Sequence, residues 1–269
     1  MTIRSIEKEL WIDAAPEDVW RAFTDAQEIV NWFAPRAESQ PGVGGYIELA
    51  WDLKAVQPSR CHILEWRPHA HLLMTWRDAP GGEHELPVEL TLAKQDGGTL
   101  LRLVHSGFLS DASWDEEYES HGRGWSYELR SLKYYVEHHF GRARQLVMER
   151  LPVSGDGKAA WQAIVGPSGA FRVLDGLAEG AEFVLGLPTG ETTSAELMFA
   201  VKDRDFVATV SMLQGGLFRL ALELISGVPE VWIWAFSWQL SDAELKTLTL
   251  PIFEAIRERL SAGSLSLPK

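Results

Sequence analysis

Cysteine is almost absent from this chain of 269 residues, in which Cys61 is the only one. A single cysteine excludes an intrachain disulfide, so packing and hydrogen bonds must hold the fold. No apolar run approaches the roughly 20 residues of a membrane-spanning helix. Glu7 and Lys8 also come too early for the apolar stretch of a signal peptide. These absences predict a cytoplasmic protein without a membrane span.

Basic residues are scarce. The chain has 25 Lys and Arg against 38 Asp and Glu, which gives a formal net charge of −13. Each half is negative when the chain is divided at Gly155, so neither half is a basic domain. Because this charge repels a phosphate backbone, nucleic acid is not an expected partner.

Aromatic and apolar residues are abundant by comparison. Hydrophobic residues make up 46% of the chain, and 12 residues are Trp. This composition is typical of a folded protein, and the length suits two domains better than one. Large rings either fill a core or form the wall of a cavity, and composition leaves both readings open.

The first half has the pattern of one α+β domain. Alternation predicts a strand over 3–12, Pro16 is suited to the first turn of a helix, and a short helix around 29–33 ends before Pro35. Further strands, separated by turn residues, are predicted at 46–52, 60–66, 72–77, 87–94 and 99–106. Apolar residues then recur every three or four positions over 118–140. The order predicts an antiparallel meander followed by one long amphipathic helix.

The second half repeats this order. Turn formers over 151–157 interrupt the pattern and predict a domain boundary, with a first domain at 1–150 and a second at 156–262. Strands are predicted at 182–187, 195–201, 206–212, 217–224 and 231–240, with a helix over 241–260. Residues 196–210 align with 62–76 without a gap, 134 positions later. Only 159–165 precede these strands, so the second copy is predicted to be truncated at its start.

Several motifs in the first half occur in the order of a known family. The longest is the stretch from Ile12 to Asp25, IDAAPEDVWRAFTD, followed by Asn31-Trp32-Phe33. The later ones are Gly44-Gly45 before a strand, Ile63-Leu64-Glu65-Trp66-Arg67-Pro68, Val104-His105-Ser106-Gly107-Phe108 and Gly124-Trp125. Over about residues 3–145, the chain resembles the heat-shock protein 90 ATPase activator family of the lipid-transfer and polyketide-cyclase-like superfamily.

The resemblance implies an α+β helix-grip fold, in which a curved antiparallel β-sheet wraps around a long C-terminal helix and a cavity lies between them. Together with the repeat, it predicts such a domain followed by a truncated second copy. Eukaryotic members that stimulate the chaperone ATPase carry a separate N-terminal domain, which is not apparent here. One fold hosts many activities, so the site has to be argued separately.

The alternation of each strand assigns residues to the concave face. On the strand at 99–106, Leu101, Leu103 and His105 share that face, and His105 and Tyr118 are the polar groups expected to orient a ligand. The candidate ligand-binding residues are Trp32, Phe33, Ile47, Leu49, Trp51, Met74, Trp76, Leu101, Leu103, His105, Tyr118, Trp125 and Leu129. The alternative is a filled core, in which His105 is bonded to a neighbour.

Signals for catalysis, metals and cofactors are weak. Neither a nucleophile elbow nor a glycine-rich phosphate loop occurs. His69 and His71 are a possible pair of metal ligands, but no third ligand stands at a telling spacing, while the adjacent His138 and His139 point apart on a helix. The sequence therefore predicts no catalytic set, no metal and no cofactor.

Three hypotheses follow. The first is a binding module for a small hydrophobic or amphipathic ligand. The second is a protein-interaction or co-chaperone-like regulator, with a protein partner or a homodimer, motivated by the run from Val231 to Phe236, which is apolar on both faces of a strand. The third is a cyclase or hydrolase-type enzyme that uses His105 or Tyr118 as acid or base.

Overall fold

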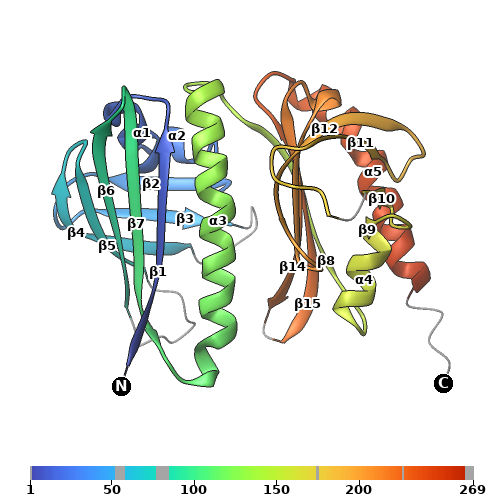
Figure 1. The fold of residues 1–269 in the computed structure, drawn as a ribbon, viewed down its shortest axis with the longest axis horizontal. Coiled ribbons are helices and arrows are strands. Elements are labelled where there is room, and N and C mark those ends of the chain that lie inside the picture. The colour runs from blue at the N-terminus through green and yellow to red at the C-terminus, as the bar shows by residue number, and fades with distance from the viewer. Residues whose placement is uncertain (1, 52–57, 77–84, 174–175, 226, 264–269) are drawn as a thin grey trace. The chain divides into compact units, whose positions relative to one another are not determined.

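The computed structural model describes all residues except 1, 52–57, 77–84, 174–175, 226 and 264–269. Contacts divide the chain into two compact units, Met1–Ala143 and Arg144–Lys269. Each unit pairs one antiparallel-rich sheet with a long helix (Figure 1). The predicted α+β helix-grip architecture, with a second copy behind the first, is confirmed.

The first unit begins with a strand and two helices and continues as a meander. Its elements are β1 (Ile3–Ile12), α1 (Pro16–Thr24), α2 (Ala26–Ile29), β2 (Arg36–Gln40), β3 (Tyr46–Ala50), β4 (Ser59–Arg67), β5 (His71–Trp76), β6 (Leu86–Gln95), β7 (Gly98–Leu109), a 3-10 turn at Ala112–Trp114 and α3 (Asp115–His138). The strands form one sheet in the order β1-β7-β6-β5-β4-β3-β2. The sheet curves, and α3 runs along it (Figure 1).

Local chemistry explains where these helices begin and end. Pro16 occupies the first turn of α1 beside Glu17 and Asp18, where negative charge is favourable. The Asp25 side chain caps α2 by accepting a hydrogen bond from the Gln27 backbone N–H. The helix α3 ends at His138 rather than Phe140, since Gly141 adopts a left-handed φ of 77°.

Two parts of the first sheet differ from the sequence expectation. The strand β2 was not predicted, because its sequence RAESQ has no apolar alternation and it lies at the sheet edge. Asp52 and Arg77, the last residues of two predicted strands, lie outside the described residues. The remaining predicted strands agree with the observed ones to within a few residues.

The second unit has the same succession. Its elements are β8 (Gln145–Pro152), α4 (Gly157–Ile164), β9 (Val165–Gly166), β10 (Phe171–Arg172), β11 (Glu182–Gly186), β12 (Thr192–Val201), β13 (Asp205–Val210), a 3-10 turn at Ser211–Leu213, β14 (Gly216–Ile225), β15 (Val228–Ser237) and α5 (Asp242–Gly263). The sheet order is β8-β15-β14-β13-β12-β11-β10-β9.

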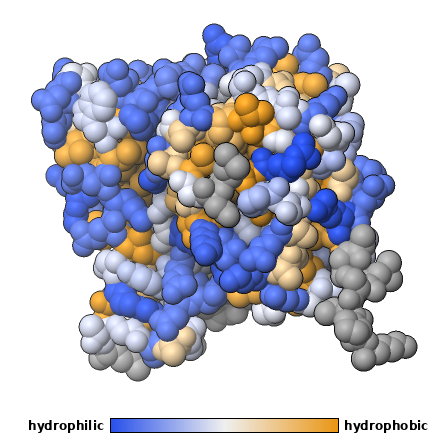
Figure 2. Space-filling view, turned by 45° about the vertical axis from the view of Figure 1, so that its right-hand side comes forward, coloured by the Kyte–Doolittle hydropathy of each residue, from blue (hydrophilic) through white to orange (hydrophobic). Residues whose placement is uncertain are grey.

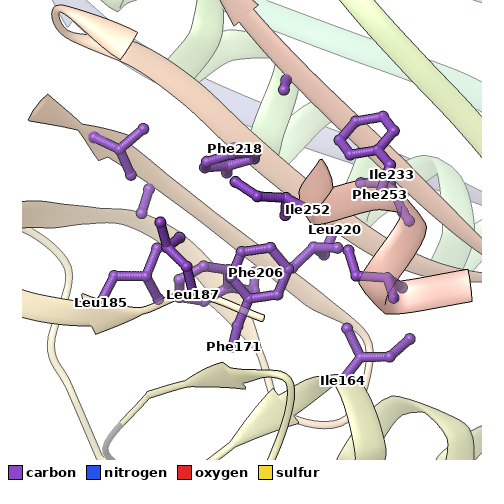
Figure 3. Close-up of a cluster of buried hydrophobic side chains, with 14 of the residues drawn as sticks. Ile164, Phe171, Leu185, Leu187, Phe206, Phe218, Leu220, Ile233, Ile252 and Phe253 are labelled. Carbon is purple, nitrogen blue, oxygen red and sulfur yellow. The ribbon is translucent and has the colours of Figure 1, made fainter. Parts of the chain in front are cut away.

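The core of the second unit is an apolar cluster. Figure 3 shows Phe171, Phe206 and Phe218 together, with Ile233 from β15 and Phe253 from α5 beside them. The Phe171 and Phe218 ring centroids are 5.7 Å apart. In β15, Val231, Ile233 and Ala235 belong to this cluster, and Trp234 and Phe236 are also buried.

Backbone details confirm the internal repeat at a spacing of 134 positions. The β4–β5 pairing has a bulge between Ile63 and Glu65, and the β12–β13 pairing has one between Leu197 and Phe199. The following turns contain a left-handed residue at equivalent places, His69 with φ 64° and Asp203 with φ 59°. Because these irregularities coincide, equivalent positions of the two sheets can be paired residue by residue.

The truncation of the second copy is smaller than the sequence indicated. An opening strand and helix are present: β8 pairs with β15 along its length, as β1 pairs with β7, and α4 follows it. Both are shorter than their counterparts in the first unit, where β1 has 10 residues against 8 in β8. The predicted boundary at Gly155 thus falls inside the second unit.

Hydrophilic residues prevail on the face shown in Figure 2, with smaller hydrophobic areas between them. Among the described residues, no helix combines the length and apolar character needed to cross a bilayer.

Candidate functional site

The concave face of the first sheet carries the predicted strand residues. Leu101, Leu103 and His105 are fully buried on β7, while Arg102 between them is exposed, so the assignment of faces from the alternation is confirmed. From neighbouring strands, the predicted residues Ile47, Leu49, Met74 and Trp76 are also buried.

Aromatic rings form a layer between this face and α3. Phe33 lies at its centre, with ring centroids 4.5 Å from Trp51, 5.7 Å from Trp125 and 6.4 Å from Trp76. Trp32 stacks on Phe33 at 4.8 Å. Edge-to-face and stacked contacts at these separations are favourable for aromatic pairs. The structure therefore brings together the five rings that the sequence analysis placed in this region.

His105 is the polar group within this layer. Its Nδ1 accepts a hydrogen bond of 3.0 Å from the Trp125 indole N–H. Its Nε2 is buried and has no hydrogen-bond partner among the described residues. Burial, reinforced by the nearby His121, lowers the pKa of His105 to about 3, so the imidazole is neutral at physiological pH.

His121 and Phe108 complete the surroundings of His105, and neither is among the predicted site residues. Their ring centroids lie 5.0 Å and 4.8 Å from that of His105. The His121 Nδ1 lies 2.9 Å from the Glu117 carbonyl oxygen, one helical turn earlier. A signal for His121 was available, because it precedes Trp125 by four positions and so shares its helix face.

Tyr118 does not join this group. Its hydroxyl donates a hydrogen bond of 3.2 Å to the Ser5 carbonyl oxygen on β1, and Arg4 covers its ring at 4.5 Å. Its ring centroid lies 5.5 Å from that of Phe108, at the edge of the layer. Leu129, the remaining predicted residue, is buried on α3. The structure therefore separates Tyr118 from His105 and gives no direct pair of acid and base.

A second buried polar network ties the short helices to the end of α3. The Tyr135 hydroxyl donates to Glu28 Oε2 at 2.5 Å and accepts from the Asn31 side-chain amide and from the Gly141 N–H. Arg21 pairs with the other oxygen of Glu28 at 2.5 Å. Burial raises the pKa of Tyr135, so its hydroxyl stays protonated. This network fixes α1 and α2 against the end of α3, and single-sequence patterns do not reveal such long-range partners.

Metal binding has no support in the described part of the chain. The His71 Nε2 lies 2.9 Å from Glu89 Oε1, and its Nδ1 lies 3.6 Å from Glu65. No group of three or more His, Cys, Asp or Glu side chains among the described residues is arranged to hold a metal ion.

An open groove lies at the β2–β3 edge of the first sheet. It has a volume of about 540 Å³ and is lined by Val30, Pro35, Arg36, Ala37, Glu38, Glu48, Leu49, Ala50 and Pro58. Leu49 is its only predicted site residue, so this groove is distinct from the aromatic layer around His105.

Three solved structures illustrate what the chain is similar to. CalU16 from Micromonospora echinospora is 28% identical, with a TM-score of 0.41, over 51% of this chain and 78% of its own. The protein MLL2253 from Mesorhizobium loti is 26% identical, with a TM-score of 0.45, over 51% and 98%. DynU16, from the dynemicin biosynthetic locus, is 16% identical, with a TM-score of 0.42, over 96% of both chains. None of the curated proteins matches the chain.

The family comparison concerns the first unit. Residues 13–137 match the family described as activator of Hsp90 ATPase homolog 1-like protein. This range runs from the end of β1 to the last turn of α3 and includes every predicted site residue. The resemblance inferred from the motifs is thereby confirmed for this part of the chain.

Proposed function

We propose that the first unit binds a small hydrophobic or amphipathic molecule between the concave face of its sheet and α3. The observation that carries the proposal is His105, a fully buried imidazole whose Nε2 has no partner among the described residues. A buried polar atom without a partner costs free energy, and a ligand that supplies the partner removes that cost.

The surroundings of His105 suit such a ligand. Trp76, Phe108 and Trp125 have ring centroids within 6.2 Å of the imidazole. Small-molecule sites typically combine apolar walls with a few polar groups that fix orientation. We infer that the rings provide affinity and that His105 provides orientation.

Acid–base catalysis by His105 is less well supported. The Nδ1 of His105 is occupied by the Trp125 N–H, and its pKa of about 3 lies far from neutral pH. An effective general acid or base has a pKa near the working pH. Binding is therefore the function that this geometry supports best.

Native mass spectrometry of the gently purified full-length protein tests the proposal. We expect an added mass that disappears on denaturation, together with a rise in melting temperature when the delipidated protein receives a ligand of the matching class. The variant Leu103→Trp, which fills space on the concave face, should abolish the added mass if it folds. An apo mass, with no thermal shift across fatty acids, sterols and aromatic polyketides, would contradict the proposal.

A further inference from the structure

The hydrogen bond between Trp125 and His105 fixes which ring nitrogen carries the proton. An indole N–H can only donate, so the His105 Nδ1 facing it at 3.0 Å must present a lone pair. A neutral imidazole carries one N–H, which must then be on Nε2. Protonation of Nδ1 would place a second N–H against the indole donor. The contact with Trp125 and the burial of the ring therefore both favour the neutral imidazole that is protonated on Nε2.

The Nε2–H of His105 is therefore a hydrogen-bond donor of fixed position that has no acceptor among the described residues. The residue is fully buried, and no described group accepts from this nitrogen. The rings around it are those of Trp76, Phe108, His121 and Trp125. None of the three carbocyclic or indole rings offers a conventional acceptor lone pair.

The second unit shows that the fold does not need an imidazole at this place. In the first sheet, Met74 on β5 is opposite Val88 on β6, which is opposite His105 on β7. The equivalent row of the second sheet is Ala208, Phe218 and Ala235.

The shared bulge and left-handed turn fix this correspondence, so His105 and Ala235 are equivalent. Ala235 is fully buried in an apolar cluster. Val210 replaces Trp76 at the same spacing. The second unit has neither the donor nor the ring beside it, so the fold itself does not require them, and the hydrogen bond from Trp125 to Nδ1 leaves the buried Nε2–H of His105 without a role.

We propose that the His105 Nε2–H is the contact that selects the ligand of this domain, and that it selects an uncharged hydrogen-bond acceptor, such as a ketone or quinone oxygen, on a flat apolar body. The inference rests on the proposed function and names the class of ligand. The neighbouring rings favour flat ligands because aromatic faces stack.

The absence of charge on His105 disfavours a ligand with a carboxylate group at this place. A buried carboxylate needs a cation or several donors to offset its desolvation, and a single neutral N–H does not suffice. An acidic ligand is thus excluded from the site by the same residue that binds a ketone.

Three naphthalene probes of nearly equal shape test this selectivity on the full-length, delipidated protein by calorimetric titration. They are 2-acetylnaphthalene, in which a carbonyl oxygen is available, 2-isopropenylnaphthalene, in which a methylene group replaces it, and 2-naphthoate. We expect the ketone to bind about tenfold more tightly than the alkene, the ratio typical of one buried hydrogen bond, and the carboxylate to bind most weakly.

Variants separate the donor from the shape of the pocket. His105→Met should bind ketone and alkene equally, and His105→Gln, which keeps an N–H donor near the Nε2 position, should restore part of the preference. His62→Met is the matched control, because His62 is exposed on β4 and is not one of the candidate site residues, and it should leave all three affinities unchanged.

Nitrogen-15 NMR of the histidine side chains adds a test on the unaltered protein. A His105 ring protonated on Nε2 at neutral pH supports the inference, and one protonated on Nδ1 overturns it. Equal affinity of wild type for ketone and alkene overturns the selectivity while leaving the proposed function standing. If no probe binds and the native mass is that of the bare chain, the proposed function fails and the inference with it. An endogenous ligand without an acceptor overturns the inference alone.

Discussion

At the scale of single residues, His105 couples the interior of the first unit to pH. Its pKa of about 3 in the folded state lies below the ordinary value of 6.5 because the ring is buried near His121. Between these two values the unfolded chain binds a proton that the folded chain excludes. The free energy of unfolding linked to His105 is therefore highest above about pH 6.5, and it decreases as the pH falls toward 3.

The first prediction follows from this sign. Below about pH 6.5, the free energy of unfolding of the wild type relative to His105→Gln should fall by about 1.4 kcal/mol per pH unit. Urea denaturation of both proteins at several pH values measures this difference, in which titrations common to both proteins cancel. A difference that is independent of pH would show that His105 is not buried in neutral form.

Tyr135 gives a second prediction. Tyr135→Phe removes a hydroxyl that makes three hydrogen bonds and leaves the buried Glu28 and Asn31 without that partner. We expect a loss of about 1–3 kcal/mol in the free energy of unfolding. Tyr118→Phe removes a hydroxyl with a single bond at the domain surface and should cost less than about 0.5 kcal/mol. Equal losses for the two variants would contradict the role assigned to the network.

The sequence predicted the position of a side chain correctly where strand alternation determines which face it lies on, and incorrectly where no such alternation exists. The concave face of β7 was predicted because Arg102 had to face water. The prediction that Tyr118 lies beside His105 did not account for contacts with β1. Tyr118 lies in the first turn of α3, where Arg4 covers its ring and the Ser5 carbonyl oxygen accepts its hydroxyl. Whether the candidate residues bind a ligand stays a prediction.

At the scale of elements, close pairing of distant strands sets strict limits on side chains. A Cβ at Gly98, the first residue of β7, would lie 2.4 Å from the Ile12 carbonyl oxygen and 2.8 Å from the Trp11 ring. In contrast, a Cβ at Gly122 in α3 would meet no heavy atom within 4 Å.

These two glycines give a third prediction, in which alanine substitution changes the stability of the protein in opposite directions at the two positions. Gly98→Ala should destabilise the protein by about 1–3 kcal/mol through overpacking, whereas Gly122→Ala should stabilise it by about 1 kcal/mol, because alanine has the higher helix propensity. Thermal unfolding of both variants measures the pair. A stabilised Gly98→Ala protein would refute the close contact between β1 and the start of β7.

Elements were predictable from sequence when their periodicity was clean. The strand β8 was overlooked because Leu146, Val147 and Met148 are apolar in succession, so they show no alternation directly after a long helix. The strand β2 was overlooked because four of its five residues are polar and the fifth is only an alanine. In both cases the pairing partner, β15 or β3, defines the strand, and pairing between distant segments leaves no local signal.

At the scale of the whole molecule, the position of β8 yields a fourth prediction. This strand pairs with β15, so a shortened protein that ends at Pro152 would carry an unpaired strand, while one that ends at Ala143 would not. Unpaired strands promote association. We expect sizing chromatography to show more self-association for the longer protein. The reverse order would support the boundary at Gly155 that the sequence predicted.

Two copies of one topology in a single chain also create a problem during folding. Opening strand β1 and its counterpart β8 each pair antiparallel with the last strand of their own sheet, so an exchange of partners would preserve the antiparallel pairing over most of its length. Neighbouring domains of like topology are prone to such misassembly. The different interiors oppose it, because a strand shaped to pack beside His105 does not fit the cluster around Ala235. We expect that a chain in which the β8 sequence replaces β1 would refold more slowly and yield dimers by strand exchange, whereas unchanged refolding would show that the interiors contribute nothing to fidelity.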